Sequence, residues 1–196
     1  MPVTPRTAPF PGDEPFSCGW TGTKSGGAAV NVSWIKTSPH VGTHVDAPFH
    51  YDDAGHRVGG FDLEAFVGPC VVIDARGASE LGIELLRGID LRRAPRVLFR
   101  TQERSDPHTF RDEYPVLTRG AVDELARNEV RLVGIDAPSF DRGADDLPIH
   151  HALGRARIAN VENLVLDRVQ AGTYELLAQP LAWVEMDAAP IRAILR

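Results

Sequence analysis

The sequence predicts a single α/β domain of 196 residues, in which strands alternate with a few short helices. Apolar runs of strand length recur along the chain, and amphipathic segments of helix length lie between some of them. The length suits one domain with a substantial core and is short for two. Hydrophobic residues make up 43% and charged residues 24% of the chain, which is ordinary for a globular protein.

The charge and cysteine content exclude several classes of protein. A net charge of −6 argues against nucleic acid or an anionic membrane as the main partner. No apolar run approaches the roughly 18 residues of a membrane span, and no signal-peptide pattern opens the chain. Cys18 and Cys70 are far apart and form no C-x-x-C pair. We expect Cys70 to be a buried free thiol and the cytoplasm to be the compartment.

The first 36 residues predict an arm followed by a strand. Residues 1–16 contain five of the fifteen prolines, so we expect an extended arm with a turn at 10–13. Residues 24–27 (Lys-Ser-Gly-Gly) predict a second turn. Residues 28–36 alternate weakly between apolar and polar side chains, as in a strand.

The stretch 40–50 concentrates the metal-binding chemistry. It reads His-Val-Gly-Thr-His-Val-Asp-Ala-Pro-Phe-His, so four residues of metal-ligand type fall within it: His40, His44, Asp46 and His50. Prolines flank and interrupt the stretch, which opposes a helix. All four positions are even, so an extended chain would project them to one side. Three histidines and an aspartate in register favour a metal or catalytic site over structural histidines.

A straight strand cannot bring all of these ligands to one ion. At about 3.3 Å per residue, His40 and His44 would stand roughly 13 Å apart, whereas zinc ligands lie about 2.0–2.2 Å from the ion. The chain therefore bends at 42–43, where Gly42 permits unusual backbone angles, or the ligands divide between two ions. We expect a kinked strand or loop wrapped around metal.

The middle of the chain predicts alternating elements. We expect a solvated loop at 51–56, strands at 67–75, 96–101 and 131–136, a short helix at 80–87 ended by Gly88, and a helix from the N-cap Thr118 to about 128. In that helix Val122, Leu125 and Ala126 should face inward. Residues 102–117 read as irregular, with His108 on the surface, and 141–148 as a polar loop rich in aspartate.

The last third of the chain carries a second group of residues with metal-ligand chemistry. His150-His151 opens a short helical stretch, and Glu162 lies on a strand-like run at 158–166. A remote histidine and carboxylate are what the first cluster lacks for a closed two-ion site. Residues 174–184 predict a strand with Pro180 at a bulge or edge. We expect 187–190 to end it and a terminal turn of helix to follow.

These motifs resemble the metal-dependent cyclase family, and within it the bacterial kynurenine formamidases. The H-x-G-T-H-x-D-A-P-x-H pattern at 40–50 carries most of the resemblance. It continues through Phe-Pro-Gly-Asp (10–13), Gly-Ile-Asp-Ala-Pro-Ser (134–139), His150-His151, Glu162 and the closing Asp-Ala-Ala-Pro-Ile-Arg-Ala-Ile-Leu-Arg (187–196). Nearly the whole chain is covered.

The resemblance implies a swivelling β/β/α fold, a homodimer, and hydrolysis of N-formylkynurenine to kynurenine and formate by a metal-activated water. It assigns His40, His44 and Asp46 to one zinc ion and shares Asp46 with a second ion that also binds His150, while Glu162 touches both ions. Manganese is the other option. His50 would be the general acid/base. Phe10 stands where the formamidases usually carry a tryptophan that contacts the substrate ring, and 141–148 offer aspartates in place of a serine-lysine pair.

Two alternatives to the formamidase function stay open. One is a hydrolase of the same family that acts on another small amide or a cyclic, isatin-like amide. The other is a non-catalytic metal-binding protein, which His50 argues against because a structural site needs no acid/base. Structural zinc sites also tend to be closed and rich in cysteine, and neither cysteine lies near these ligands.

Overall fold

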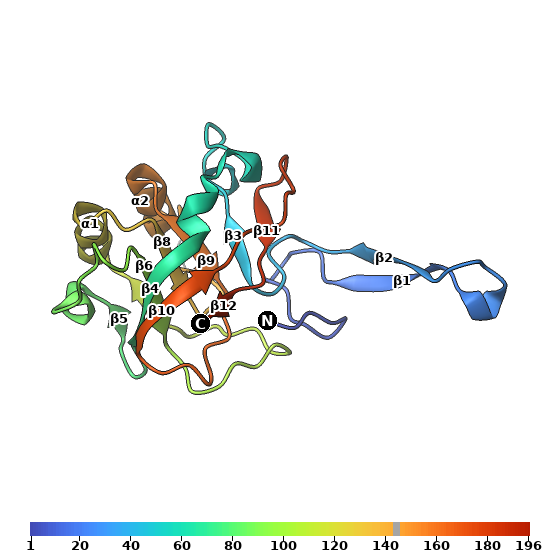
Figure 1. The fold of residues 1–196 in the computed structure, drawn as a ribbon, viewed down its shortest axis with the longest axis horizontal. Coiled ribbons are helices and arrows are strands. Elements are labelled where there is room, and N and C mark those ends of the chain that lie inside the picture. Colours follow the sequence, from blue (N-terminus) through green and yellow to red (C-terminus); the bar gives the residue numbers. More distant parts are fainter. Residues whose placement is uncertain (143–145) are drawn as a thin grey trace.

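A computed structural model describes residues 1–142 and 146–196, and its centre is an eight-stranded mixed sheet in the order β11-β3-β9-β8-β6-β4-β10-β12 (Figure 1). The strands are β3 (His44–Asp46), β4 (Val67–Asp74), β6 (Arg96–Arg100), β8 (Leu132–Ile135), β9 (Ala159–Glu162), β10 (Gly172–Leu177), β11 (Ala188–Pro190) and β12 (Ile194–Leu195). Strands β4, β6, β8 and β9 run parallel, and the outer pairs are antiparallel. The predicted α/β class is confirmed.

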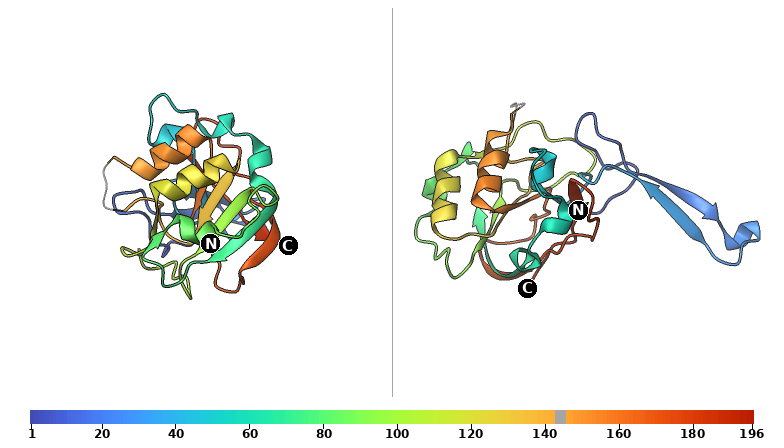
Figure 2. Two further views of the ribbon diagram at one scale, coloured as in Figure 1. Left: turned by 90° about the vertical axis from the view of Figure 1, so that its left-hand side faces the viewer. Right: turned by 90° about the horizontal axis from the view of Figure 1, so that it is seen from above.

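Two helices, α1 (Arg119–Arg127) and α2 (Pro148–Ala156), lie side by side against one face of the sheet (Figure 2). The Thr118 hydroxyl caps α1 by accepting the N–H of Ala121 at 3.2 Å, as the sequence predicts. Val122 and Leu125 are buried, but the expectation for Ala126 was wrong. Ala126 lies just outside the buried stripe of the helix, and Ala121 fills the inward position instead.

The side chains of the sheet alternate between two apolar cores, one under the helices and one on the opposite face. Val133 of β8 packs in the helix-side core, whereas Val45 of β3 and Val161 of β9 pack in the opposite core. The neighbours of Val45 and Val161 in β3 and β9 therefore point to the helix side. Those neighbours are the ligand-type residues of the two predicted clusters.

A β-hairpin extends from this body, formed by β1 (Ser17–Gly22) and β2 (Val32–Lys36), with a 3₁₀ turn at Lys24–Gly26 near its tip (Figures 1 and 2). The predicted turn and the second strand are confirmed, although the strand begins at Val32. The partner strand β1 has no clear alternation and was not predicted. Trp20 and Trp34 leave 63% and 47% of their surface exposed, so the hairpin presents aromatic rings to solvent.

The predicted helix at 80–87 was wrong. Strand β5 (Glu80–Leu81) pairs in parallel with β7 (Val116–Leu117), and only a short 3₁₀ turn follows at Ile83–Leu86. Gly82 is extended between them and interrupts any continuous helix. Gly88 does adopt the left-handed conformation predicted for it, with φ of 79°.

The predicted terminal helix turn was also wrong, because the chain end supplies β11 and β12 to the two edges of the sheet. The strand predicted at 174–184 spans Gly172–Leu177, and Pro180 forms only an isolated bridge with Ile191. Within the described residues, no helix has the length and apolar character needed to span a bilayer. The aspartate-rich loop predicted at 141–148 lies partly outside the described residues, since 143–145 are not among them.

Candidate metal centre

The pairing of β3 with β9 brings three of the predicted ligands together. His44 lies opposite Glu162 and Asp46 lies opposite Asn160 in this antiparallel register. The alternation that buries Val45 and Val161 on one face places these four polar side chains on the other. His44, Asp46 and Glu162 are all at most 3% exposed, so the carboxylates are held away from bulk water.

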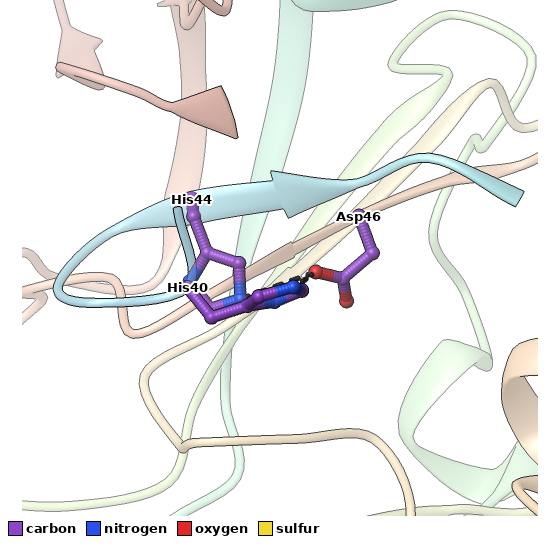
Figure 3. Close-up of side chains that lie close together, drawn as sticks. All are labelled: His40, His44 and Asp46. Carbon is purple, nitrogen blue, oxygen red and sulfur yellow. Dashed lines mark ion pairs between the residues drawn. The ribbon is translucent and has the colours of Figure 1, made fainter. Parts of the chain in front are cut away.

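The predicted bend at Gly42 returns His40 to the same site. Gly42 has φ of 80°, which is favourable only for glycine, and the chain turns there between His40 and β3. The centroids of the His40 and His44 rings lie 4.9 Å apart, and the rings meet edge to face. Both point toward the carboxylate of Asp46 (Figure 3). The interpretation of a kinked strand is confirmed.

His150 reaches the centre from α2. Its ring is 2% exposed, and its Nε2 faces Asp46 Oδ2 at 3.4 Å and Glu162 Oε1 at 3.2 Å. Its Nδ1 donates to Asp141 Oδ2 at 2.7 Å. The sequence-remote histidine and glutamate thus meet the cluster of β3.

The distances between the ligand atoms test whether these residues fit a metal pair. Two ligands of one tetrahedral zinc ion lie about 3.3 Å apart, given bond lengths of about 2.0–2.2 Å. Asp46 Oδ1 lies 3.0 Å from His40 Nδ1 and 3.2 Å from His44 Nε2. Its other oxygen faces His150, so one carboxylate serves two adjacent three-residue groups, His40–His44–Asp46 and Asp46–His150–Glu162. All five residues of these groups are ones that the family resemblance assigns to the two ions.

The hydrogen bonds around His44 provide a second test. Its Nδ1 donates to the carbonyl of Gly42 at 2.9 Å, which leaves a lone pair on Nε2 of the neutral ring. Among the described residues, neither His44 Nε2 nor Asp46 Oδ1 has a hydrogen-bond partner, although both are buried. A cation bound between these two buried atoms would satisfy both of them. The donor set therefore fits divalent metal ions.

The electrostatics of the centre favour positive charge. Burial opposes the charged form of His40, but the neighbouring carboxylates of Asp187 and Asp46 raise its pKa to about 10. The pKa of His150 is raised well above its ordinary value because bonds to Asp141, Asp46 and Glu162 outweigh its burial. The pKa of Asp46 is lowered despite its burial, chiefly by His44 and His150. The carboxylates that raise these pKa values also attract a divalent cation, which would take the place of the protons on the rings.

His50 lies at the open edge of the centre. It ends the 3₁₀ turn Pro48–His50 that follows β3, and its side chain is 33% exposed. The centroid of its ring lies 4.2 Å from the centroid of the His40 ring, and its Nδ1 lies 3.3 Å from Asp187 Oδ2. The same carboxylate oxygen lies 2.9 Å from His40 Nε2. A half-exposed imidazole beside the buried cluster can exchange protons with a bound molecule.

Phe10 lines a cavity of about 260 Å³ beside the kinked loop. Its ring meets that of Phe110 edge to face, with centroids 5.2 Å apart. Gly42 and Asn163, which adjoin the ligand strands, border the same cavity together with Arg104 and Arg111. The cavity therefore offers aromatic and cationic groups beside the kinked loop, but none of the candidate metal ligands lines it.

The structure brings all six predicted residues of the centre together, but sequence reasoning missed three that support them. Asp141 orients His150, Asp187 bridges two histidines, and Asn160 Nδ2 donates to Asp46 Oδ2 at 2.7 Å. Asn160 could have been found from its spacing of two before Glu162 on one strand. His108, His56 and the 52–53 aspartates are exposed, as predicted.

Comparison with known sequences gives one family and a consistent set of relatives. The model of the family described as Cyclase matches residues 1–142. A kynurenine formamidase of Bacillus cytotoxicus is 40% identical, over 100% of this chain and 94% of that protein. A kynurenine formamidase of Geobacillus thermodenitrificans is 43% identical, over 95% and 90%. One of Bordetella pertussis is 41% identical, over 100% and 94%.

Solved structures agree with the sequence relatives. A potential metal-dependent hydrolase with cyclase activity superposes with a TM-score of 0.85 at 28% identity, over 100% of this chain and 94% of that chain. Isatin hydrolase A from Ralstonia solanacearum superposes with a TM-score of 0.79 at 25% identity, over 100% and 89%.

Proposed function

The chain belongs to the cyclase family, and from this membership we propose that it is a metal-dependent amidohydrolase that converts N-formyl-L-kynurenine to L-kynurenine and formate. Three kynurenine formamidases at 40–43% identity, each matched over at least 90% of its length, support the substrate. The observation that carries the chemistry is the shared carboxylate of Asp46, which faces histidines on both sides.

We propose two Zn²⁺ ions per subunit, with Mn²⁺ as the other metal that the oxygen-rich donor set accepts. His40, His44 and Asp46 would hold one ion, and Asp46, His150 and Glu162 the other. When bound, such ions supply a water of lowered pKa as nucleophile and a Lewis acid for the carbonyl oxygen. Glu162 would contribute to both ligand groups, because its Oε2 lies 3.6 Å from His44 Nε2 and its Oε1 lies 3.2 Å from His150 Nε2.

The residues of the chain then complete the reaction. Cleavage of an aryl formamide breaks the bond between the formyl carbon and the amine nitrogen that is attached to the aromatic ring. The departing amine needs a proton. His50 is the group placed to give it, since an imidazole both donates and accepts protons near pH 7. Because the His50 side chain is partly exposed, a substrate can reach it from solvent, whereas the metal-ligand side chains are largely buried.

Phe10 is proposed to contact the aromatic ring of the substrate. It is 47% exposed, and it lines the cavity that borders the kinked loop. A phenyl ring already packed edge to face with Phe110 presents a fixed apolar surface to a second ring. Phe10 would thus serve in place of the tryptophan that related formamidases are expected to carry at this position.

Two other functions are less well supported. The similarity to isatin hydrolase A supports hydrolysis of a cyclic amide such as isatin. That protein, however, shares only 25% sequence identity with this chain, whereas the formamidases share about 40%. A non-catalytic metal-binding protein would not require a half-exposed histidine beside the ligands. An assay of formate release from N-formyl-L-kynurenine distinguishes both alternatives from the proposed formamidase function.

We further propose a homodimer of single-domain subunits in the cytoplasm, each spanning residues 1–196 with 1–16 as an arm. The hairpin supports the dimer, because five of its large apolar residues are at least 47% exposed: Trp20, Val30, Val32, Trp34 and Ile35. A surface of this kind on one projecting element is typical of an interface. A second copy of the chain would cover it.

The deciding experiment combines metal analysis with a formate-release assay on N-formyl-L-kynurenine. We expect close to two equivalents of metal per chain, activity that chelation removes and metal restores, and weaker turnover of isatin. Absence of formate release from protein with its metal bound would reject the formamidase assignment. Hydrolysis of isatin under the same conditions would then favour the cyclic-amide alternative.

A further inference from the structure

Asp187 lies between the two most accessible histidines of the centre. It directly precedes β11, whose pairing with β3 sets Ala188 opposite Asp46. The carbonyl of Asp187 accepts the N–H of Ala47 at 2.8 Å, which extends this pairing by one residue. The following Ala188 and Ala189 are fully buried, so the backbone that carries the Asp187 carboxylate is fixed in the sheet.

One oxygen of this carboxylate contacts both rings. Asp187 Oδ2 lies 2.9 Å from His40 Nε2 and 3.3 Å from His50 Nδ1. The His40 contact leaves Nδ1 of that ring directed at Asp46 Oδ1, 3.0 Å away. Within the part of the chain that the structure describes, the His50 contact leaves Nε2 of that ring without a hydrogen-bond partner. A single carboxylate thus determines which nitrogen of each ring remains available to other groups.

We propose that Asp187 is a positioning residue that holds His50 with its proton on Nδ1 and its Nε2 free for the substrate, while it orients the metal ligand His40. A carboxylate bonded to one ring nitrogen fixes both the tautomer and the direction of a catalytic imidazole. Carboxylates that bond to metal-binding histidines orient those ligands in the same way. This inference rests on the proposed function, because it assumes that His50 exchanges a proton with the substrate.

The test uses the full-length, zinc-loaded protein and the variant Asp187→Ala, with Asp53→Ala as a matched control. Asp53 is an exposed carboxylate only three residues after His50. Steady-state assays with N-formyl-L-kynurenine at saturating zinc should show kcat reduced by about 10–100-fold in Asp187→Ala, with KM unchanged. Asp187→Glu should recover part of the lost kcat, and Asp53→Ala should match the parent.

Long-range ¹H–¹⁵N correlation spectra of the histidine rings provide a readout that does not depend on activity. We expect His50 of the parent to show the Nδ1–H tautomer, and His50 of Asp187→Ala to lose that preference. Full kcat in Asp187→Ala, or an unchanged His50 tautomer, would overturn the inference. Loss of bound metal, with kcat restored by excess zinc, would also overturn it, because Asp187 would then serve the metal alone.

The two proposals fail in distinguishable ways. A parent protein that binds metal but releases no formate rejects the proposed function. The tautomer comparison between parent and Asp187→Ala remains valid in that case and decides the positioning role by itself.

Discussion

The carboxylate of Asp141 accepts hydrogen bonds from both the ring Nδ1 and the backbone N–H of His150, at 2.7 and 3.0 Å. It also accepts the N–H of Ile149 at 3.1 Å. Leu147, which precedes α2, has a left-handed backbone and offers no side-chain cap. Asp141 therefore caps the helix from outside it while it directs the helix's histidine at the metal centre.

Asp141→Asn should weaken both roles. An amide supplies one acceptor oxygen where the carboxylate supplies two, so part of the bonding to His150 and Ile149 is lost. We expect metal affinity to fall about 10–100-fold and the free energy of unfolding to fall by about 1–2 kcal/mol. Metal titration by calorimetry and urea unfolding measure the two effects. Asp146→Asn, an exposed change near the same helix start, should alter neither.

His50→Ala should abolish turnover without loss of metal. The side chain lies beside His40 and forms a third group of ligand-type residues with His40 and Asp187, but it belongs to neither group that contains Asp46. General acid/base catalysis contributes about 10²–10⁴-fold, so kcat should fall within that range while the metal content stays at the parent value. Elemental analysis and formate release measure the two quantities. Metal lost together with activity would make His50 a ligand, and His56→Ala serves as the exposed control.

The double change Trp20→Ser, Trp34→Ser should convert a dimer into monomers. These rings are largely exposed on the hairpin, and removing them takes most of the aromatic surface from the proposed interface. Light scattering after size-exclusion chromatography measures the mass directly. Leu181→Ser, which alters an equally exposed apolar side chain elsewhere, should leave the dimer intact. A parent protein that is already monomeric would contradict the homodimer.

The cluster at 40–50 could be predicted from the sequence because its information is local, whereas His150 and Glu162 were assigned through the family resemblance. The spacing within 40–50 and the glycine at 42 were enough to predict the bend that unites His40 with Asp46. Asp187 could not be found in this way, since its position depends on the register of β11 against β3 across more than a hundred residues. Asp141 was hidden for a similar reason, in a stretch that reads as a solvated loop.

The failed elements show tertiary pairing overriding local pattern. Residues 80–87 have the apolar spacing of a short helix, yet Glu80 and Leu81 pair with β7, and Gly82 stays extended. The C-terminal end has residues compatible with a helix, but the sheet edges bind its backbone as β11 and β12. A short segment has too few local interactions to resist such pairing.

Asp136 should make stability depend on pH. Burial raises the pKa of its carboxyl above the unfolded value of 3.8, although the hydroxyl and N–H of Thr101 and the N–H of Gln102 oppose the shift. The folded protein therefore holds this proton more tightly than the unfolded chain. Its stabilising contribution is complete below pH 3.8 and is lost as the pH rises through the higher folded pKa.

Asp136→Asn removes this titration and isolates its effect. The free energy of unfolding of the parent, minus that of the variant, should decrease as the pH rises from about 4 toward 7, by about 1.4 kcal/mol for each tenfold difference in proton affinity. Urea unfolding of both proteins at several pH values measures this slope, and effects common to the two cancel. Asp112→Asn, at an exposed carboxylate, gives the comparison slope. A parent–variant difference for Asp136 that rises with pH would mean that the three donors outweigh burial and that the pKa of this carboxyl is lowered.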